Sequence, residues 1–256
     1  MRRAATVVAA CALSLVACGD DDGGDTGSGA AGSTLTVFAA SSLTDAFGEL
    51  EQTYEADNPG VDVQFTFDSS STLAEQVVQG APVDVLATAD ENTMQTVVDE
   101  GLTAGAPIAF AQNSLILVTP PDDPGGIQDV ADLDARDVDF AVCAPDAPCG
   151  AATQMLFGIV GVTADPVTEE ENVRDVLAKV TQGEVDAGLV YVSDAQAAGD
   201  DVVAIEIGQA DQALNSDVIA ALSEADDPEA ARAWVDLITS AEAEQVLTDL
   251  GFLRAP

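Results

Sequence analysis

Two clusters of serine residues follow strand-like segments and stand where helix-like segments begin. The first is Ser41–Ser42, after the apolar residues 35–40, and the second is Ser69–Ser71, after the alternating residues 61–67. A helix start has backbone N–H groups without helical acceptors and the positive end of the helix dipole. Two such starts facing one another, with hydroxyl groups as extra donors, would bind an anion. Simple N-capping, in which serine is a preferred residue, is the alternative interpretation.

The charge of the chain excludes several classes of partner. The 256 residues carry a formal net charge of −39, with seven Lys and Arg residues and no His. Arg2 and Arg3 belong to a targeting segment, which leaves Arg136, Arg174, Lys179, Arg232 and Arg254. So few cations cannot form a basic patch, so we expect no nucleic-acid partner and no electrostatic attraction of the folded domain to an anionic membrane.

An exported serine hydrolase that uses Ser42 or Ser70 is poorly supported. The chain has no His to act as general base, and neither serine lies in a Gly-x-Ser-x-Gly motif. A Ser–Lys dyad would need Lys179, the only lysine. We therefore expect that the protein is not an enzyme and has no cofactor.

The N-terminus is typical of an export signal. Arg2 and Arg3 precede an apolar run, residues 4–17, which ends in Leu-Val-Ala before Cys18. This ending resembles a bacterial lipobox, which implies cleavage before Cys18 and lipidation of that residue; an ordinary signal peptide with a chance cysteine is the alternative. We expect a signal peptide at residues 1–17 and a flexible tether at residues 18–33, rich in Gly, Asp, Ser and Thr. The protein would then be anchored to the outer face of the cell membrane as a lipoprotein.

Two further cysteines, Cys143 and Cys149, remain after Cys11 in the signal and Cys18 at the lipid site. An exported chain meets a non-reducing environment, so we predict a Cys143–Cys149 disulfide. Its short loop limits the entropic stabilisation to less than ~3 kcal/mol. A zinc site is the alternative, but two thiols without any His cannot complete the usual ligand sets.

The rest of the chain alternates strand-like and helix-like segments, which is typical of an α/β fold. Thr168 and Glu171 have the spacing of a capping box ahead of a helix that contains Val173. The expected strands are residues 35–40, 61–67, 83–87, 114–119, 139–143, 187–192, 202–207 and 217–222. The expected helices are residues 43–54, 73–78, 92–100, 150–160, 173–180, 228–238 and 241–250.

Five sequence blocks in this order carry a family resemblance. They are residues 37–44 (VFAASSLT), 69–74 (SSSTLA), 80–85 (GAPVDV), 171–174 (ENVR) and 188–194 (GLVYVSD), with a lesser block at residues 113–115. Together they make the chain resemble the periplasmic molybdate-binding proteins of bacterial ABC importers, which are type II substrate-binding proteins. The resemblance covers roughly residues 35–253.

The resemblance implies a two-lobed type II periplasmic-binding-protein fold, with the ligand in the cleft between the lobes. Lobe I would comprise residues 34–113 and 208–256, and lobe II residues 114–207. The chain would cross between the lobes at hinge strands near residues 113–117 and 204–207.

The resemblance also implies a ligand set without countercharges. The oxyanion-binding residues would be Ser42 and Ser70, the backbone N–H groups of Cys149 and Val173, and the hydroxyl of Tyr191. Molybdenum would be bound as molybdate through these same residues. The family's Pro-Ala-Gly segment corresponds here to residues 148–150 (PCG), and residues 215–222 lack a Tyr-Pro pair associated with the family.

The expected function is that of an extracytoplasmic solute-binding protein, a monomer, which captures molybdate or tungstate and delivers it to an ABC transporter permease. A site made only of neutral donors suits an oxyanion without protons, because the proton of monohydrogen phosphate would lack an acceptor. A binding protein for another tetrahedral oxyanion, such as sulfate, is the alternative.

Overall fold

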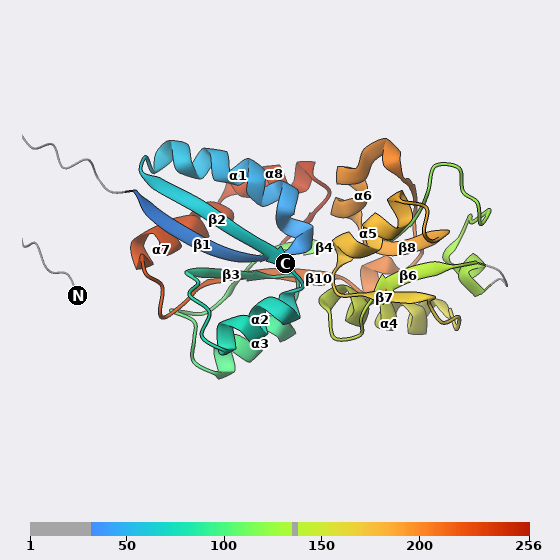
Figure 1. The fold of residues 1–256 in the computed structure, drawn as a ribbon, viewed down its shortest axis with the longest axis horizontal. Coiled ribbons are helices and arrows are strands. Elements are labelled where there is room, and N and C mark those ends of the chain that lie inside the picture. The colour runs from blue at the N-terminus through green and yellow to red at the C-terminus, as the bar shows by residue number, and fades with distance from the viewer. Residues whose placement is uncertain (1–31, 135–137) are drawn as a thin grey trace, which may run out of the picture. The chain divides into compact units, whose positions relative to one another are not determined.

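The computed structural model describes residues 32–134 and 138–256. The predicted signal peptide, the lipid site at Cys18 and nearly all of the tether lie outside these residues. The described part of the chain contains two β-sheets, each covered by helices (Figure 1). None of the described helices is long and apolar enough to span a membrane. The expected α/β class is confirmed.

The first sheet has the strand order β11-β4-β10-β3-β1-β2. Its parallel part joins β1 to β2 and β3, and its antiparallel part joins β10 to β3 and β4 and joins β11 to β4. The strands are β1 (Ser33–Ala40), β2 (Val61–Asp68), β3 (Val85–Thr88), β4 (Ile108–Asn113), β10 (Asn215–Ala221) and β11 (Leu253–Arg254).

Helices cover both faces of this first sheet, and this explains why β1 is apolar on both sides. Leu35 and Val37 pack on one face with α1 (Thr44–Asp57), α7 (Pro228–Ile238) and α8 (Ala241–Asp249). Phe38 packs on the opposite face with α2 (Ser70–Val78) and α3 (Glu91–Asp99). A strand buried on both faces reads as a continuous apolar run instead of an alternating one.

The second sheet has the strand order β7-β6-β8-β5-β9 and a core of its own. The strands are β5 (Leu115–Thr119), β6 (Phe140–Cys143), β7 (Thr168–Glu170), β8 (Ala187–Tyr191) and β9 (Val203–Ile205), and the helices are α4 (Pro148–Val160), α5 (Val173–Thr181) and α6 (Val192–Ala198). Helix α5 packs closely on β8 at Gly188, where a Cβ atom would lie 2.9 Å from Val176 and 2.8 Å from Val180.

The predicted capping box at Thr168 and Glu171 is wrong. Thr168 lies in β7, where it pairs with Ala141 of β6, so it is extended and too far from the helix to cap it. The N-cap of α5 is Asn172, whose side-chain oxygen accepts the N–H groups of Arg174 and Asp175 at 3.0 and 3.1 Å. An Asn at this position satisfies the free N–H groups of the helix.

The chain passes between the two sheets at two places. The first passage is at Ser114, between the end of β4 and the start of β5, within the segment expected to be a hinge. The second lies after the expected segment 204–207, because β9 pairs with β5 and both Ile207 and Ala213 pack in the second core. The expected position was therefore several residues too early.

Asp217, on β10 of the first sheet, is a carboxyl group buried without a partner. It is 0% exposed, and neither of its oxygens has a hydrogen-bond partner among the described residues. Desolvation by burial, with repulsion from Asp194 and Asp90, raises its pKa from 3.8 to about 8. Between about pH 4 and pH 8 the Asp217 carboxyl is therefore protonated in the folded protein and ionised in the unfolded chain.

The raised pKa of Asp217 predicts that the free energy of unfolding falls as the pH rises from about 4 to about 8, because the unfolded chain binds fewer protons than the folded protein in that range. Asp217→Asn, which is neutral throughout, should remove much of that loss. We compare the free energy of unfolding of the variant, minus that of the wild type, at two pH values. This difference should be about 2–5 kcal/mol larger at pH 9 than at pH 5. Urea unfolding at a series of pH values measures this difference, and parallel pH profiles for the two proteins would contradict it.

Candidate functional site

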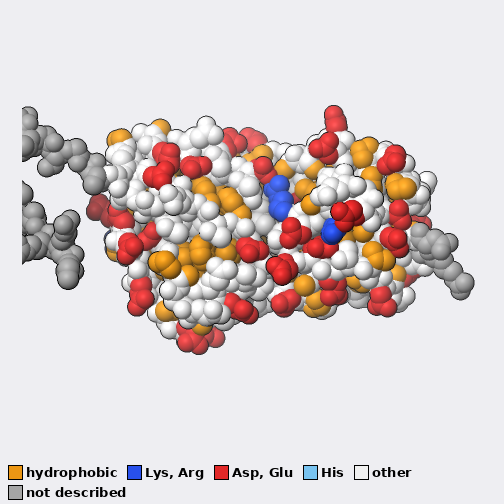
Figure 2. All heavy atoms as spheres, viewed as in Figure 1, with side chains coloured by type: hydrophobic (Ala, Val, Ile, Leu, Met, Phe, Trp, Pro, Cys, Tyr) orange, Lys and Arg blue, Asp and Glu red, His pale blue; other side chains and the backbone are white. Residues whose placement is uncertain are grey.

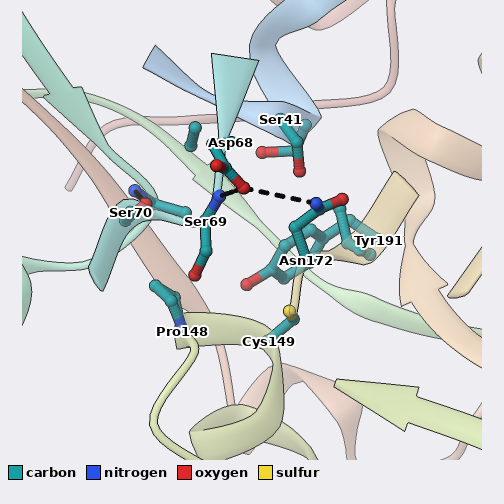
Figure 3. A pocket seen from close by; sticks show the side chains of 12 residues that line it. Ser41, Asp68, Ser69, Ser70, Pro148, Cys149, Asn172 and Tyr191 are labelled. Atoms are coloured by element: carbon teal, nitrogen blue, oxygen red, sulfur yellow. Dashed lines mark hydrogen bonds between the residues drawn. The ribbon is translucent and has the colours of Figure 1, made fainter. Parts of the chain in front are cut away.

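A small cavity lies where the helices of the first sheet meet those of the second (Figure 3). The empty space among its lining atoms is only about 210 Å³, open solvent included, so the cavity suits a small ion. It is lined by Ala40, Ser41, Ser42, Asp68, Ser69, Ser70 and Ala89, and by Pro148, Cys149, Asn172, Val173 and Tyr191. The structure thus brings together all five residues expected to bind the ligand.

The register of β1 and β2 places the two serine clusters side by side. Ala40 pairs with Asp68 at the carboxyl ends of these parallel strands, so the residues that follow each strand leave the sheet at the same edge. Ser42 lies in the short 3-10 helix η1 (Ser41–Leu43) before α1, and Ser70 is the first residue of α2. Ligands of open α/β sheets commonly bind outside the carboxyl ends of the strands.

The hydroxyl groups of these serines differ in their present partners. The Ser70 oxygen accepts the N–H of Ala89 at 3.0 Å, which leaves its own hydrogen free to be donated. The Ser42 oxygen is buried and has no hydrogen-bond partner among the described residues. Leaving a buried hydroxyl unsatisfied costs roughly 1–3 kcal/mol, so a ligand that accepts from it would be stabilised.

Cys149 is held at the start of α4 by two local constraints. The Cys143–Cys149 disulfide joins the end of β6 to the first turn of the helix. A Cβ atom on Gly150 would lie 1.9 Å from the carbonyl oxygen of Ala144, so only glycine allows this approach. Together they direct the first N–H groups of α4 at the cavity, with Pro148 in the first helical position, where no N–H is needed.

Val173 presents the start of α5 to the same cavity. It is the first residue of the helix and is 2% exposed. The side chain of its N-cap, Asn172, serves the N–H groups of the two following residues and not that of Val173. The backbone donor of Val173 thus remains available to a ligand.

The Tyr191 side chain enters the cavity from the end of β8 (Figure 3). Its hydroxyl is buried and, like that of Ser42, has no hydrogen-bond partner among the described residues. Burial, with the negative charges of Asp217, Asp194 and Asp90, raises its pKa well above the ordinary value. The phenol therefore stays protonated and can donate a hydrogen bond.

No Lys or Arg belongs to the lining of this cavity. Arg174 is adjacent to Val173, but it is ion-paired with Asp194, Nε to Oδ1 at 2.8 Å, and with Asp45. Burial of Asp194 outweighs the attraction of Arg174 and raises the pKa of that carboxyl to about 6. The proposed donors of the cavity are therefore all neutral groups. Among the described residues there is also no cluster of three or more His, Cys, Asp or Glu side chains that could hold a metal ion.

The sequence interpretation did not place Asp68 and Asn172 in the site. The Asp68 carboxylate accepts the N–H of Ser69 at 2.7 Å and the Asn172 side-chain amide at 3.4 Å (Figure 3). Asp68 stands directly before the second serine cluster, a signal that a carboxylate would lie near the donors. Its contact with Asn172 depends on how the two sheets are arranged, which local sequence does not show.

The chain is similar to known proteins over most of its length. The family model of bacterial extracellular solute-binding proteins matches residues 35–253. The molybdate-binding protein ModA of Mycobacterium tuberculosis is 40% identical over 242 residues, which is 94% of this chain and 93% of that protein. ModA of Escherichia coli is 31% identical over 232 residues, 85% of this chain and 88% of that protein.

Solved structures share the fold at lower identity. The periplasmic molybdate-binding protein of Azotobacter vinelandii superposes with a TM-score of 0.77 at 18% identity, over 87% of this chain and all of that one. The sulfate-binding protein SubI of M. tuberculosis gives 0.73 at 17% identity, over 86% of each chain. These likenesses confirm the periplasmic-binding-protein fold. The match over residues 35–253 and the high coverage of its relatives show that the chain belongs to the bacterial extracellular solute-binding protein family.

Proposed function

We propose that this protein captures molybdate outside the cytoplasm and delivers it to an ABC transporter permease, with tungstate as an alternative ligand. The observation that carries the proposal is the pair of buried hydroxyls of Ser42 and Tyr191, which lack protein partners among the described residues and line one small cavity. Ser70 and the backbone donors of Cys149 and Val173 complete the proposed ligand set. The names of the relatives, molybdate-binding proteins, support the same ligand.

The chemistry of the donors favours an oxyanion without protons. Molybdate, tungstate and sulfate can accept from every donor, whereas monohydrogen phosphate also needs an acceptor. Asp68 is the one carboxylate in the lining; its Oδ1 accepts from Ser69 and Asn172, and it does not belong to the proposed ligand set. Size would then distinguish molybdate and tungstate from the smaller sulfate.

We propose that the two sheets are lobes that close over the ligand by a hinge motion. The passages of the chain at Ser114 and near Leu214 support hinges there, so residues 115–213 would form lobe II and the rest of the described chain lobe I.

For the N-terminus we propose what its sequence indicates. Cys18 would carry a lipid, a tether would follow it, and the protein would be a monomer anchored at the outer face of the cell membrane.

Titration of the ligand-free protein with molybdate, tungstate, sulfate and phosphate, followed by calorimetry, tests this function. We expect molybdate and tungstate to bind, and phosphate to bind about 10- to 100-fold more weakly because the proposed ligand set offers donors and no carboxylate for its proton. Binding of sulfate or a sugar without any binding of molybdate would overturn the proposal.

Removal of the two unpartnered hydroxyls should weaken binding without destabilising the protein. Ser42→Ala and Tyr191→Phe should each raise the Kd for molybdate about 10- to 100-fold, since hydrogen bonds to charged groups contribute roughly 1.5–3 kcal/mol. Neither variant loses an existing hydrogen bond, so their melting temperatures should match or exceed that of the wild type.

The matched control is Tyr54→Phe, at a second buried tyrosine. Its hydroxyl donates to the carbonyl of Ala230 at 2.8 Å, away from the cavity. This variant should lose stability and keep its affinity. An unchanged Kd for both Ser42→Ala and Tyr191→Phe would contradict the proposed ligand set.

Loss of the disulfide should affect binding through the start of α4. A variant with Cys143→Ser and Cys149→Ser should lose about 2 kcal/mol of stability, as expected for a loop this short. It should also bind molybdate more weakly, because the first turn of α4 loses its covalent link to β6. Calorimetry with urea unfolding measures both effects, and full affinity despite the stability loss would show that the N–H of Cys149 is positioned without the disulfide.

A further inference from the structure

Two polar contacts connect the halves of the molecule beside the proposed donors. Asn172 and Arg174, on either side of Val173, both reach residues of the first sheet's half. Asn172 donates to Asp68, which precedes the second serine cluster, and Arg174 pairs with Asp45, three residues after Ser42. The residues that flank one donor from the second half thus contact acids beside both serine clusters of the first.

We propose that the Asp45–Arg174 and Asp68–Asn172 pairs form a clamp that holds the two halves closed over the bound oxyanion. The clamp touches no proposed donor atom, so it would raise affinity by stabilising the closed arrangement. This inference rests on the proposed function for the identity of the ligand. It assigns to Asp45 and Arg174 a positioning role that the ligand set does not include.

The geometry of Arg174 suits a bridge of this kind. Its Nε is 2.8 Å from Oδ1 of Asp194, a residue of its own half that is completely buried, while Nη2 is directed to Asp45. The planar guanidinium group offers donors in a fixed fork, so anchoring one side orients the other. Lysine, with its single ammonium group, would not hold both carboxylates in this way.

The position of the clamp at the surface allows it to open. The side chains of Arg174 and Asp45 are 27% and 47% exposed, so water can replace the contact at modest cost. Asn172 caps α5 through its oxygen and reaches Asp68 through its nitrogen, so the halves can separate while the cap stays intact. The contact is therefore suited to closing and opening rather than to a permanent link.

Asp45→Ala tests the clamp most cleanly. Replacement of Arg174 would leave the buried Asp194 without its cation, which is strongly destabilising, whereas Asp45 is exposed. The matched control is Glu184→Ala. It removes a carboxylate 2.7 Å from Lys179, which is on α5 like Arg174, and this ion pair lies wholly within the second half. Asp45→Glu keeps the charge and should retain most of the clamp.

We expect Asp45→Ala to raise the calorimetric Kd for molybdate about three- to tenfold, in keeping with a partly exposed ion pair to arginine. Small-angle X-ray scattering of each protein saturated with molybdate should give a larger radius of gyration for Asp45→Ala than for the wild type, because the closed arrangement is less stable in the variant. Glu184→Ala should match the wild type in both measurements. Wild-type values for Asp45→Ala, or equal changes in Glu184→Ala, would overturn the clamp.

Failure of the proposed function is distinguishable from failure of the clamp. A wild-type protein that does not bind molybdate would overturn the ligand assignment alone. The scattering comparison between Asp45→Ala, Glu184→Ala and the wild type can then be made with whichever oxyanion the titration shows to bind, so an unchanged radius of gyration would still overturn the clamp.

Discussion

The constraint on which the site depends is that buried hydrogen-bond donors need acceptors. The hydroxyls of Ser42 and Tyr191 and the starts of helices α4 and α5 line one small cavity whose lining contains no basic side chain. Such donors are costly in a dry interior when unpaired, and they are strong when they face a charged acceptor. The strand ends, the tight turn before α4 and the cap of α5 all position these groups, so much of the architecture serves this one requirement.

A protein with a net charge of −39 that is built to bind an anion requires an electrostatic explanation. Acidic side chains are scattered over the visible face and basic ones are few (Figure 2). Charges more than ~8 Å apart across solvent are screened at physiological salt, while helix N–H groups act at contact distance. Near the cavity, burial favours the neutral form of Asp217, which reduces the repulsion that this carboxyl would exert on the ligand.

Arg174 shows how the same region excludes a simple countercharge. The guanidinium lies next to a donor residue, yet it is satisfied by Asp45 and Asp194 instead of by the cavity. This arrangement leaves selection of the ligand to neutral groups, which discriminate by shape and protonation and not by charge alone. It also connects α1 to α5, so that the positions of Ser42 and Val173 depend on one another.

Local sequence was sufficient for most elements and for the two serine clusters. Apolar runs and helical spacing predicted β1, β2, α1 and α7, and the serines and the cysteine pair were identified from their residue types and neighbours. Cys149, Val173 and Tyr191 were expected in the ligand set only because five sequence blocks resemble a known family. Tertiary structure decided what depends on distant partners. Thr168 lies in a strand because it pairs with β6, and not at the start of a helix as its spacing from Glu171 suggested. The second passage between the sheets lies after Ala213, because that residue packs in the second core. Asp68, Asn172 and Asp45 acquired their roles only when two helix starts more than a hundred residues apart were brought face to face.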